Sequence, residues 1–112
     1  MTGERCTWCD EAVELHDGWR AYEPAGARRA VFCRLEHIVP WQMRRAHWEA
    51  GERGDSAVTG HEPGPCAHCG DPVDPEIGVL LVRHRGEYRI PDDFCSVEHL
   101  AAWANAGGRW AP

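Results

Sequence analysis

The chain has 112 residues, of which 43% are hydrophobic and 27% are charged, a balance typical of a small globular protein and not of a disordered or fibrous one. Its 18 acidic and 12 basic residues give a formal net charge of -6, which excludes a protein whose whole surface is a nucleic-acid footprint. No apolar run reaches the roughly 18 residues of a membrane span, so we expect no membrane-spanning segment.

The N-terminal segment, residues 1–6, has neither the basic start nor the apolar stretch of a secretory signal. We therefore expect a cytoplasmic protein whose six cysteines stay reduced and bind metal. A mature secreted fragment would look the same at this level. All the basic residues are Arg, a bias that we attribute to a GC-rich genome, and we expect a bacterial source.

The first half of the chain begins with a Cys-x-x-Cys pair, Cys6 and Cys9. Two strands are predicted at residues 19–23 and 28–32, because Pro24-Ala25-Gly26 between them is a turn signal. The two strands should form a hairpin.

A helix is expected after this hairpin. Cys33 and His37 are four residues apart, so a helix would place both on one face. Pro40 should kink or restart the helix. Residues 41–49 are predicted as an amphipathic continuation, with these candidate packing residues: Met43, Ala46 and Trp48.

Residues 51–65 contain four glycines and two prolines and are predicted to be a flexible linker. In the second half, strands at 78–84 and 87–90 should flank the turn Arg85-Gly86, and a helix from Val97 should stop at Gly107-Gly108. Cys95 or Ser96 is its candidate N-cap. The predicted organisation is module 1 at 1–50, linker 51–65 and module 2 at 66–112.

The second half repeats the first. Cys66-Ala67-His68-Cys69 corresponds to the first Cys-x-x-Cys pair, and Phe94-Cys95-Ser96-Val97-Glu98-His99 corresponds to residues 32–37. Val73 and Gly78 correspond to Val13 and Gly18 without a gap. The repeat accounts for every cysteine in the chain.

Modules of this size rarely bury enough apolar surface to fold alone and depend on metals or disulfides. Each half offers three thiols and one imidazole, a donor set that zinc binds as a tetrahedron. A site closed by four protein ligands is structural. The sequence therefore predicts two structural zinc ions per chain, with these ligands: Cys6, Cys9, Cys33 and His37; Cys66, Cys69, Cys95 and His99. A three-disulfide framework and cluster or redox chemistry stay open as alternatives.

The motif Phe94-Cys95-Ser96 is similar to the Phe-Cys-Ser signature of treble-clef zinc fingers of the FCS, MYM or TRASH-like kind, and Phe32-Cys33-Arg34 keeps two of its three positions. The resemblance implies a small, zinc-stabilised α+β fold of two tandem treble-clef-like modules, each a zinc knuckle, a β-hairpin and a helix. It also implies a role in metal handling or in protein or nucleic-acid interaction. Those families commonly end in Cys-x-x-Cys, whereas this chain has Cys-x-x-x-His.

A second resemblance concerns Glu36-His37-Ile38-Val39-Pro40, which is similar to the Asp-His-Ile-x-Pro stretch of HNH nucleases. It implies a metal-dependent nuclease with His37 as the general base. The second half lacks the proline, and the only asparagine is Asn105. We therefore expect no enzyme, and keep the nuclease and metal sensing or storage as alternatives.

The six tryptophans are the remaining candidates for function. Trp41 and Trp103 lie four residues after the histidine ligands and are expected to pack over the metal sites, while Trp8, Trp48 and Trp110 are candidates for a protein-binding surface. His68, between two ligands, is a candidate competitor for the ion.

A local basic stretch gives a possible contact with nucleic acid through five arginines: Arg28, Arg29, Arg34, Arg44 and Arg45. The net charge favours a protein partner ahead of nucleic acid. We therefore expect a small zinc-binding protein that acts as a protein interaction or regulatory module.

Overall fold

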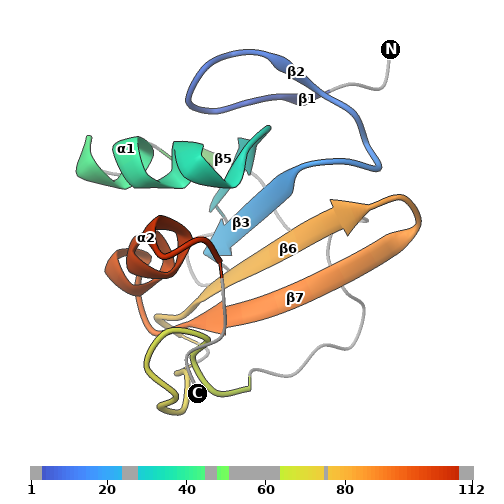
Figure 1. Ribbon diagram of the computed structural model, residues 1–112. Helices are drawn as coiled ribbons and strands as arrows, with labels where there is room; N and C mark the ends of the chain where they lie inside the picture. Colours follow the sequence, from blue (N-terminus) through green and yellow to red (C-terminus); the bar gives the residue numbers. More distant parts are fainter. Residues whose placement is uncertain (1–3, 24–27, 45–47, 51–63, 75, 109–112) are drawn as a thin grey trace.

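A five-stranded antiparallel sheet forms the centre of the molecule, with the strand order β5-β4-β3-β6-β7. The computed structural model describes residues 4–23, 28–44, 48–50, 64–74 and 76–108. Two helices, α1 and α2, pack together beside the sheet (Figure 1). The described residues therefore form a small α+β fold.

The first hairpin consists of β3 (Trp19–Glu23) and β4 (Arg28–Phe32), as the sequence predicts. The second consists of β6 (Val79–Arg85) and β7 (Tyr88–Phe94). Strand β7 runs four residues beyond its predicted end, through Pro91, because it lies at the edge of the sheet, where a missing backbone donor is tolerated.

The two hairpins pair with each other. Strand β3 lies antiparallel to β6, with a register from Trp19 opposite Arg83 to Tyr22 opposite Leu80. The halves of the repeat therefore share one sheet. The module boundaries at 50 and 66 stay a prediction, and most of the predicted linker, residues 51–63, lies outside the described residues.

The first helical segment is shorter than expected. A 3₁₀ turn at Leu35–His37 leads into α1 (Ile38–Met43), so Pro40 lies in the first turn of α1, where its missing N–H interrupts no helical hydrogen bond. The predicted restart near Pro40 is confirmed.

The predicted helix over 41–49 is wrong at Arg44, Trp48 and Glu49, which are not helical, and residues 45–47 lie outside the described residues. The chain instead forms β5 (Glu49–Ala50), which pairs with Arg28 and Arg29 at the edge of β4. Met43 is 76% exposed and does not pack as expected, and Ala46 lies outside the described residues. Trp48 does pack, edge-on against Trp41 with ring centroids 5.0 Å apart, and this contact outweighs local helix preference.

Helix α2 (Val97–Asn105) begins and ends where its sequence signals lie. The Ser96 hydroxyl accepts a hydrogen bond from the His99 amide at 3.2 Å, which identifies Ser96 as the N-cap. Gly107 and Gly108 follow with φ values of 92° and 69°, conformations that stop the helix and suit glycine.

One hydrophobic core contains residues of both halves. Trp41 of α1 packs edge-on against Phe32, and Trp103 of α2 packs against Phe94, with centroid distances of 5.0 and 5.2 Å. Both tryptophans are buried in the same cluster, which also contains Leu100. The two tryptophans are buried as expected, but the contacts seen here lie in the core between the helices and the sheet, and the predicted cover over the metal sites stays a prediction.

The repeat is visible in a pair of close contacts. A Cβ added to Gly18 would lie 2.7 Å from Cγ1 of Val13, and one added to Gly78 would lie 2.3 Å from Cγ1 of Val73. The corresponding valine and glycine of each half therefore touch, which explains why neither glycine position has room for a side chain. The described residues include no helix long and apolar enough to cross a membrane.

Candidate metal centres

The first Cys-x-x-Cys pair lies on a tight turn beside a small two-stranded ladder, β1 (Glu4–Arg5) and β2 (Ala12–Val13). The Cys6 amide donates to the Glu11 carbonyl at 2.8 Å, and the Asp10 amide donates to the Cys6 carbonyl at 2.9 Å. Asp10 has φ 65°, which closes the turn. This backbone holds both sulfurs toward the end of the first hairpin.

The second pair repeats this backbone. The Cys66 amide donates to the Asp71 carbonyl, and the Gly70 amide donates to the Cys66 carbonyl, both at 2.8 Å. Gly70 has φ 81° and stands where Asp10 stands in the first turn. The Ala67 amide also donates to the Asp93 carbonyl at 2.8 Å, which attaches the turn to β7. The sequence repeat is thus a structural repeat.

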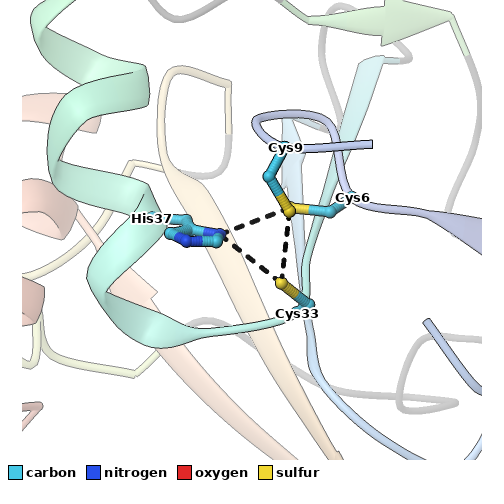
Figure 2. A group of neighbouring side chains, drawn as sticks. All are labelled: Cys6, Cys9, Cys33 and His37. Atoms are coloured by element: carbon cyan, nitrogen blue, oxygen red, sulfur yellow. Dashed lines mark hydrogen bonds between the residues drawn. The ribbon is translucent and has the colours of Figure 1, made fainter. Parts of the chain in front are cut away.

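In the first half, four side chains converge from three separate segments, as Figure 2 shows. Cys6 and Cys9 come from the turn, Cys33 follows β4, and His37 ends the 3₁₀ turn. The Nδ1 atom of His37 lies 3.4 Å from Sγ of Cys33 and 3.6 Å from Sγ of Cys6. The Sγ atoms of Cys9 and Cys33 are 3.5 Å apart.

The second half has the same arrangement. Nδ1 of His99 lies 3.7 Å from Sγ of Cys66, and the Sγ atoms of Cys69 and Cys95 are 3.6 Å apart. In each half, all four ligand atoms lie within 4.8 Å of one another. The structure therefore brings together both predicted sets of four side chains.

The spacing fits a tetrahedral metal. With zinc–sulfur bonds of about 2.3 Å and zinc–nitrogen bonds of about 2.0–2.1 Å, the edges of the tetrahedron are about 3.8 Å between sulfurs and about 3.6 Å between sulfur and nitrogen. The five separations given above run from 3.4 to 3.7 Å, and every pair in each group lies within 4.8 Å. All six cysteines, which lie within the described residues, are free, so a disulfide framework is absent. Each group of four can hold one metal ion.

The thiol pKa values show why a cation suits these groups. Burial raises the pKa of Cys6 and Cys66, but hydrogen bonds from nearby backbone amides and from the histidine outweigh it and lower the pKa to about 7 and about 6. Burial and the neighbouring cysteine sulfurs raise the pKa of Cys33 and Cys95 to about 12. The metal-free groups therefore resist full ionisation, and a divalent cation would offset the repulsion between their thiolates.

His68 and Asn105, two further candidate residues, lie on the surface and outside the two groups of four. His68 is exposed, with its ring centroid 5.0 Å from that of His99. It does not belong to the group of four in its half. Asn105, the asparagine weighed for a nuclease, is exposed at the end of α2.

The predicted basic stretch has four arginines within the described residues, and three of them have partners of their own. Arg28 pairs with Glu23 and lies over the Trp48 ring, and Arg29 pairs with Glu4. Arg44 lies over the exposed ring of Trp8, with 6.0 Å from its guanidinium carbon to the ring centroid. Arg34 is exposed, and Arg45 and Trp110 lie outside the described residues.

A groove of about 440 Å³, not predicted from the sequence, lies between the two halves, and Trp19, Glu36, Arg83 and Asp92 help to line it. Its signal in the sequence was the acidic pair Asp92-Asp93, directly before the motif Phe94-Cys95. No family model matches the chain, and no curated protein or solved structure matches it significantly.

Proposed function

We propose that the chain is a small zinc protein with one structural ion in each half, held in treble-clef-like modules, and that it acts by binding another protein. The observation that carries the zinc assignment is the convergence of three sulfurs and one imidazole nitrogen, all within 4.8 Å of one another, in both halves. Four protein ligands fill the coordination sphere, and catalytic zinc keeps one position open. A structural role follows.

The placement of the ligands supports a role in folding. In each half the cysteine pair meets a cysteine and a histidine more than 20 residues further along the chain. An ion would therefore join the knuckle, the end of the hairpin and the start of the helix. Structural zinc sites of this kind contribute about 10–16 kcal/mol of apparent binding free energy, which becomes folding free energy.

A nuclease that uses His37 is the main alternative. Its general base must be free to take a proton from water, but Nδ1 of His37 faces the sulfurs of Cys6 and Cys33. His99 occupies the same position in the other half. These matched environments favour a ligand role for both histidines. Metal sensing or storage is the third candidate, and it requires release of metal without unfolding.

A protein partner is favoured over nucleic acid by charge. Two zinc ions bound by six thiolates would take the chain from -6 to about -8. Arg28 and Arg29 are already paired with acids. Trp8 and Met43 are 37% and 76% exposed, and tryptophan and methionine are enriched in protein interfaces. We place this interaction in a bacterial cytoplasm.

The metal assignment is tested by elemental analysis of the purified protein, which should contain two zinc ions per chain. His37→Ala should lose at least one ion and melt at a lower temperature. A folded His37→Ala protein that keeps both ions but loses cleavage of DNA would establish the nuclease instead. Metal release by a chelator with an unchanged circular dichroism spectrum would favour storage.

The interaction role is tested by affinity purification of the zinc-loaded protein with mass spectrometry. The double variant Trp8→Ala, Met43→Ala should lose a partner that the wild type retains. Ile77→Ala is the matched control, because Ile77 is a comparably exposed apolar residue, 68% exposed, on another loop. Binding of nucleic acid that weakens steeply with salt would overturn the preference for a protein.

A further inference from the structure

A groove runs across the junction of the two halves, where the helical layer meets the sheet. Its volume is about 440 Å³, within the range of ligand pockets. Residues of both halves line it: Trp19, Leu35 and Glu36 from the first, and Arg83, Ile90, Asp92, Trp103, Gly107 and Gly108 from the second. Neither half has this groove alone.

One wall of the groove is apolar and aromatic. Trp19 is half-buried, Trp103 is 6% exposed, and Ile90 is 41% exposed. A Cβ on Gly108 would lie only 2.7 Å from Cδ2 of Leu35 and 3.3 Å from Cη2 of Trp103. The backbone at this glycine therefore lies directly against the apolar wall. Such a surface suits the aliphatic stem of a long side chain.

More acidic than basic side chains line the groove. Glu36 and Asp92 face a single basic group, Arg83. The Arg83 guanidinium carbon lies 5.1 Å from the centroid of the Trp19 ring. Among the residues that the structure describes, neither Glu36 nor Asp92 forms an ion pair with Arg83. The two carboxylates are thus available to a ligand.

Asp92 is half-buried, and burial together with the adjacent Asp93 raises its pKa to about 6. A carboxylate in such a place is destabilised by its surroundings and would be stabilised by a cation from outside. Side chains of this kind are concentrated at binding sites. The acidic excess and the apolar wall therefore point to the same class of ligand.

We propose that this groove binds a Lys or Arg side chain, flanked by apolar residues, from a partner polypeptide. The cationic head would meet the carboxylates of Asp92 and Glu36, and the stem would lie along Leu35 and Trp103. An anionic segment would face two carboxylates and one arginine, in a chain of net charge -6. The proposal rests on the proposed role in protein interaction and adds to the surface at Trp8 and Met43 a second contact site with a defined ligand.

The test uses the zinc-loaded, full-length protein and two capped tripeptides, acetyl-Leu-Arg-Leu-amide and acetyl-Leu-Glu-Leu-amide. NMR titration should show saturable shifts of the indole signals of Trp19 and Trp103 with the Arg peptide. The Glu peptide should bind at least tenfold more weakly. Equal affinity for the two peptides, or shifts confined to other residues, would overturn the proposal.

Asp92→Asn removes the negative charge and keeps the shape of the side chain, and should lower the affinity for the Arg peptide at least fivefold. Glu87→Gln is the matched control, since Glu87 is an exposed acid in the β6–β7 turn and does not line the groove. It should change the affinity less than twofold. An unchanged affinity in Asp92→Asn contradicts the proposal, and the wild-type comparison does not depend on how any variant folds.

The two proposals fail in different ways. If the Arg peptide does not bind but a partner is still captured through Trp8 and Met43, the groove assignment is wrong and the interaction role survives. If the wild-type protein contains no zinc or cleaves DNA, the proposed function is wrong whatever the peptides do.

Discussion

Replacing His99 by Ala tests whether the two halves fold as one unit. The variant removes one of four ligands in the second half. A structural zinc site contributes about 10–16 kcal/mol, whereas the net stability of a small domain is about 5–15 kcal/mol. Losing this site should therefore unfold at least the second half, including α2.

Unfolding of the second half should also destabilise the first half, because the two share a core and a sheet. Helix α2 places Leu100 and Trp103 in the core that also holds Trp41 and Phe32. By comparison with truncations of buried Leu and Trp, exposing these two α2 side chains would cost about 5–10 kcal/mol. Strand β3 would also lose its partner β6. Since this matches the whole stability of a small domain, His99→Ala should disorder both halves.

The assay is zinc content together with amide hydrogen exchange of β3 and β4. His99→Ala should lose zinc from both sites, and the protection of the β3–β4 amides should fall to that of the chelated wild type. His68→Ala is the matched control, because it removes a nearby imidazole outside the ligand group. It should keep two ions and native protection. Retention of one ion with fully protected β3–β4 amides in His99→Ala would refute the reasoning and show two independent modules.

Three further substitutions test the packing and the charges. Gly78→Ala should lower the free energy of unfolding by about 1–3 kcal/mol, because its Cβ would lie 2.3 Å from Cγ1 of Val73. The double variant Gly78→Ala, Val73→Ala should recover part of this loss in a thermal melt. If it recovers none, the clash with Val73 is not the cause. Glu4→Ala should cost about 1–3 kcal/mol in urea unfolding, since it leaves the fully buried Arg20 with only the backbone carbonyls of Asp17 and Glu14 as acceptors. Asp92→Asn should stabilise the protein above pH 6, because a raised folded-state pKa of about 6 makes the ionised carboxylate unfavourable there. After allowance for solvent screening the gain is about 1–2 kcal/mol, and melting curves should show it shrinking as the pH falls below 6 toward the unfolded-state pKa; a gain that grows on acidification would contradict this assignment.

The sequence predicted the local parts of this structure well. Spacing and the internal repeat predicted both groups of four side chains that the structure brings together, because a Cys-x-x-Cys turn and a Cys-x-x-x-His helical start are local geometries. The strands at 19–23 and 28–32 also match β3 and β4. These features depend on residues close together in the chain, whose preferences can be worked out one segment at a time.

The contacts between distant segments were missed. Residues 79–82, Val-Leu-Leu-Val, form a continuous apolar run, the signal of a central strand buried on both faces. All four are in fact buried, with β6 between β3 and β7. The end of α1 at Met43 was missed for the same reason, because the packing of Trp48 on Trp41 and the pairing of β5 are tertiary contacts.

The shared sheet explains what the repeat achieves beyond two metal sites. If the halves were separate modules, Leu35 and Trp103 would lie in different domains, but here both contribute to one groove. Each half provides one of the two carboxylates there, Glu36 and Asp92. Since Glu36 precedes the proposed ligand His37, and Asp92 lies on the strand that leads to Cys95, we expect metal in both halves to be needed to hold the two acids together. Recognition by this groove should therefore be lost with either ion.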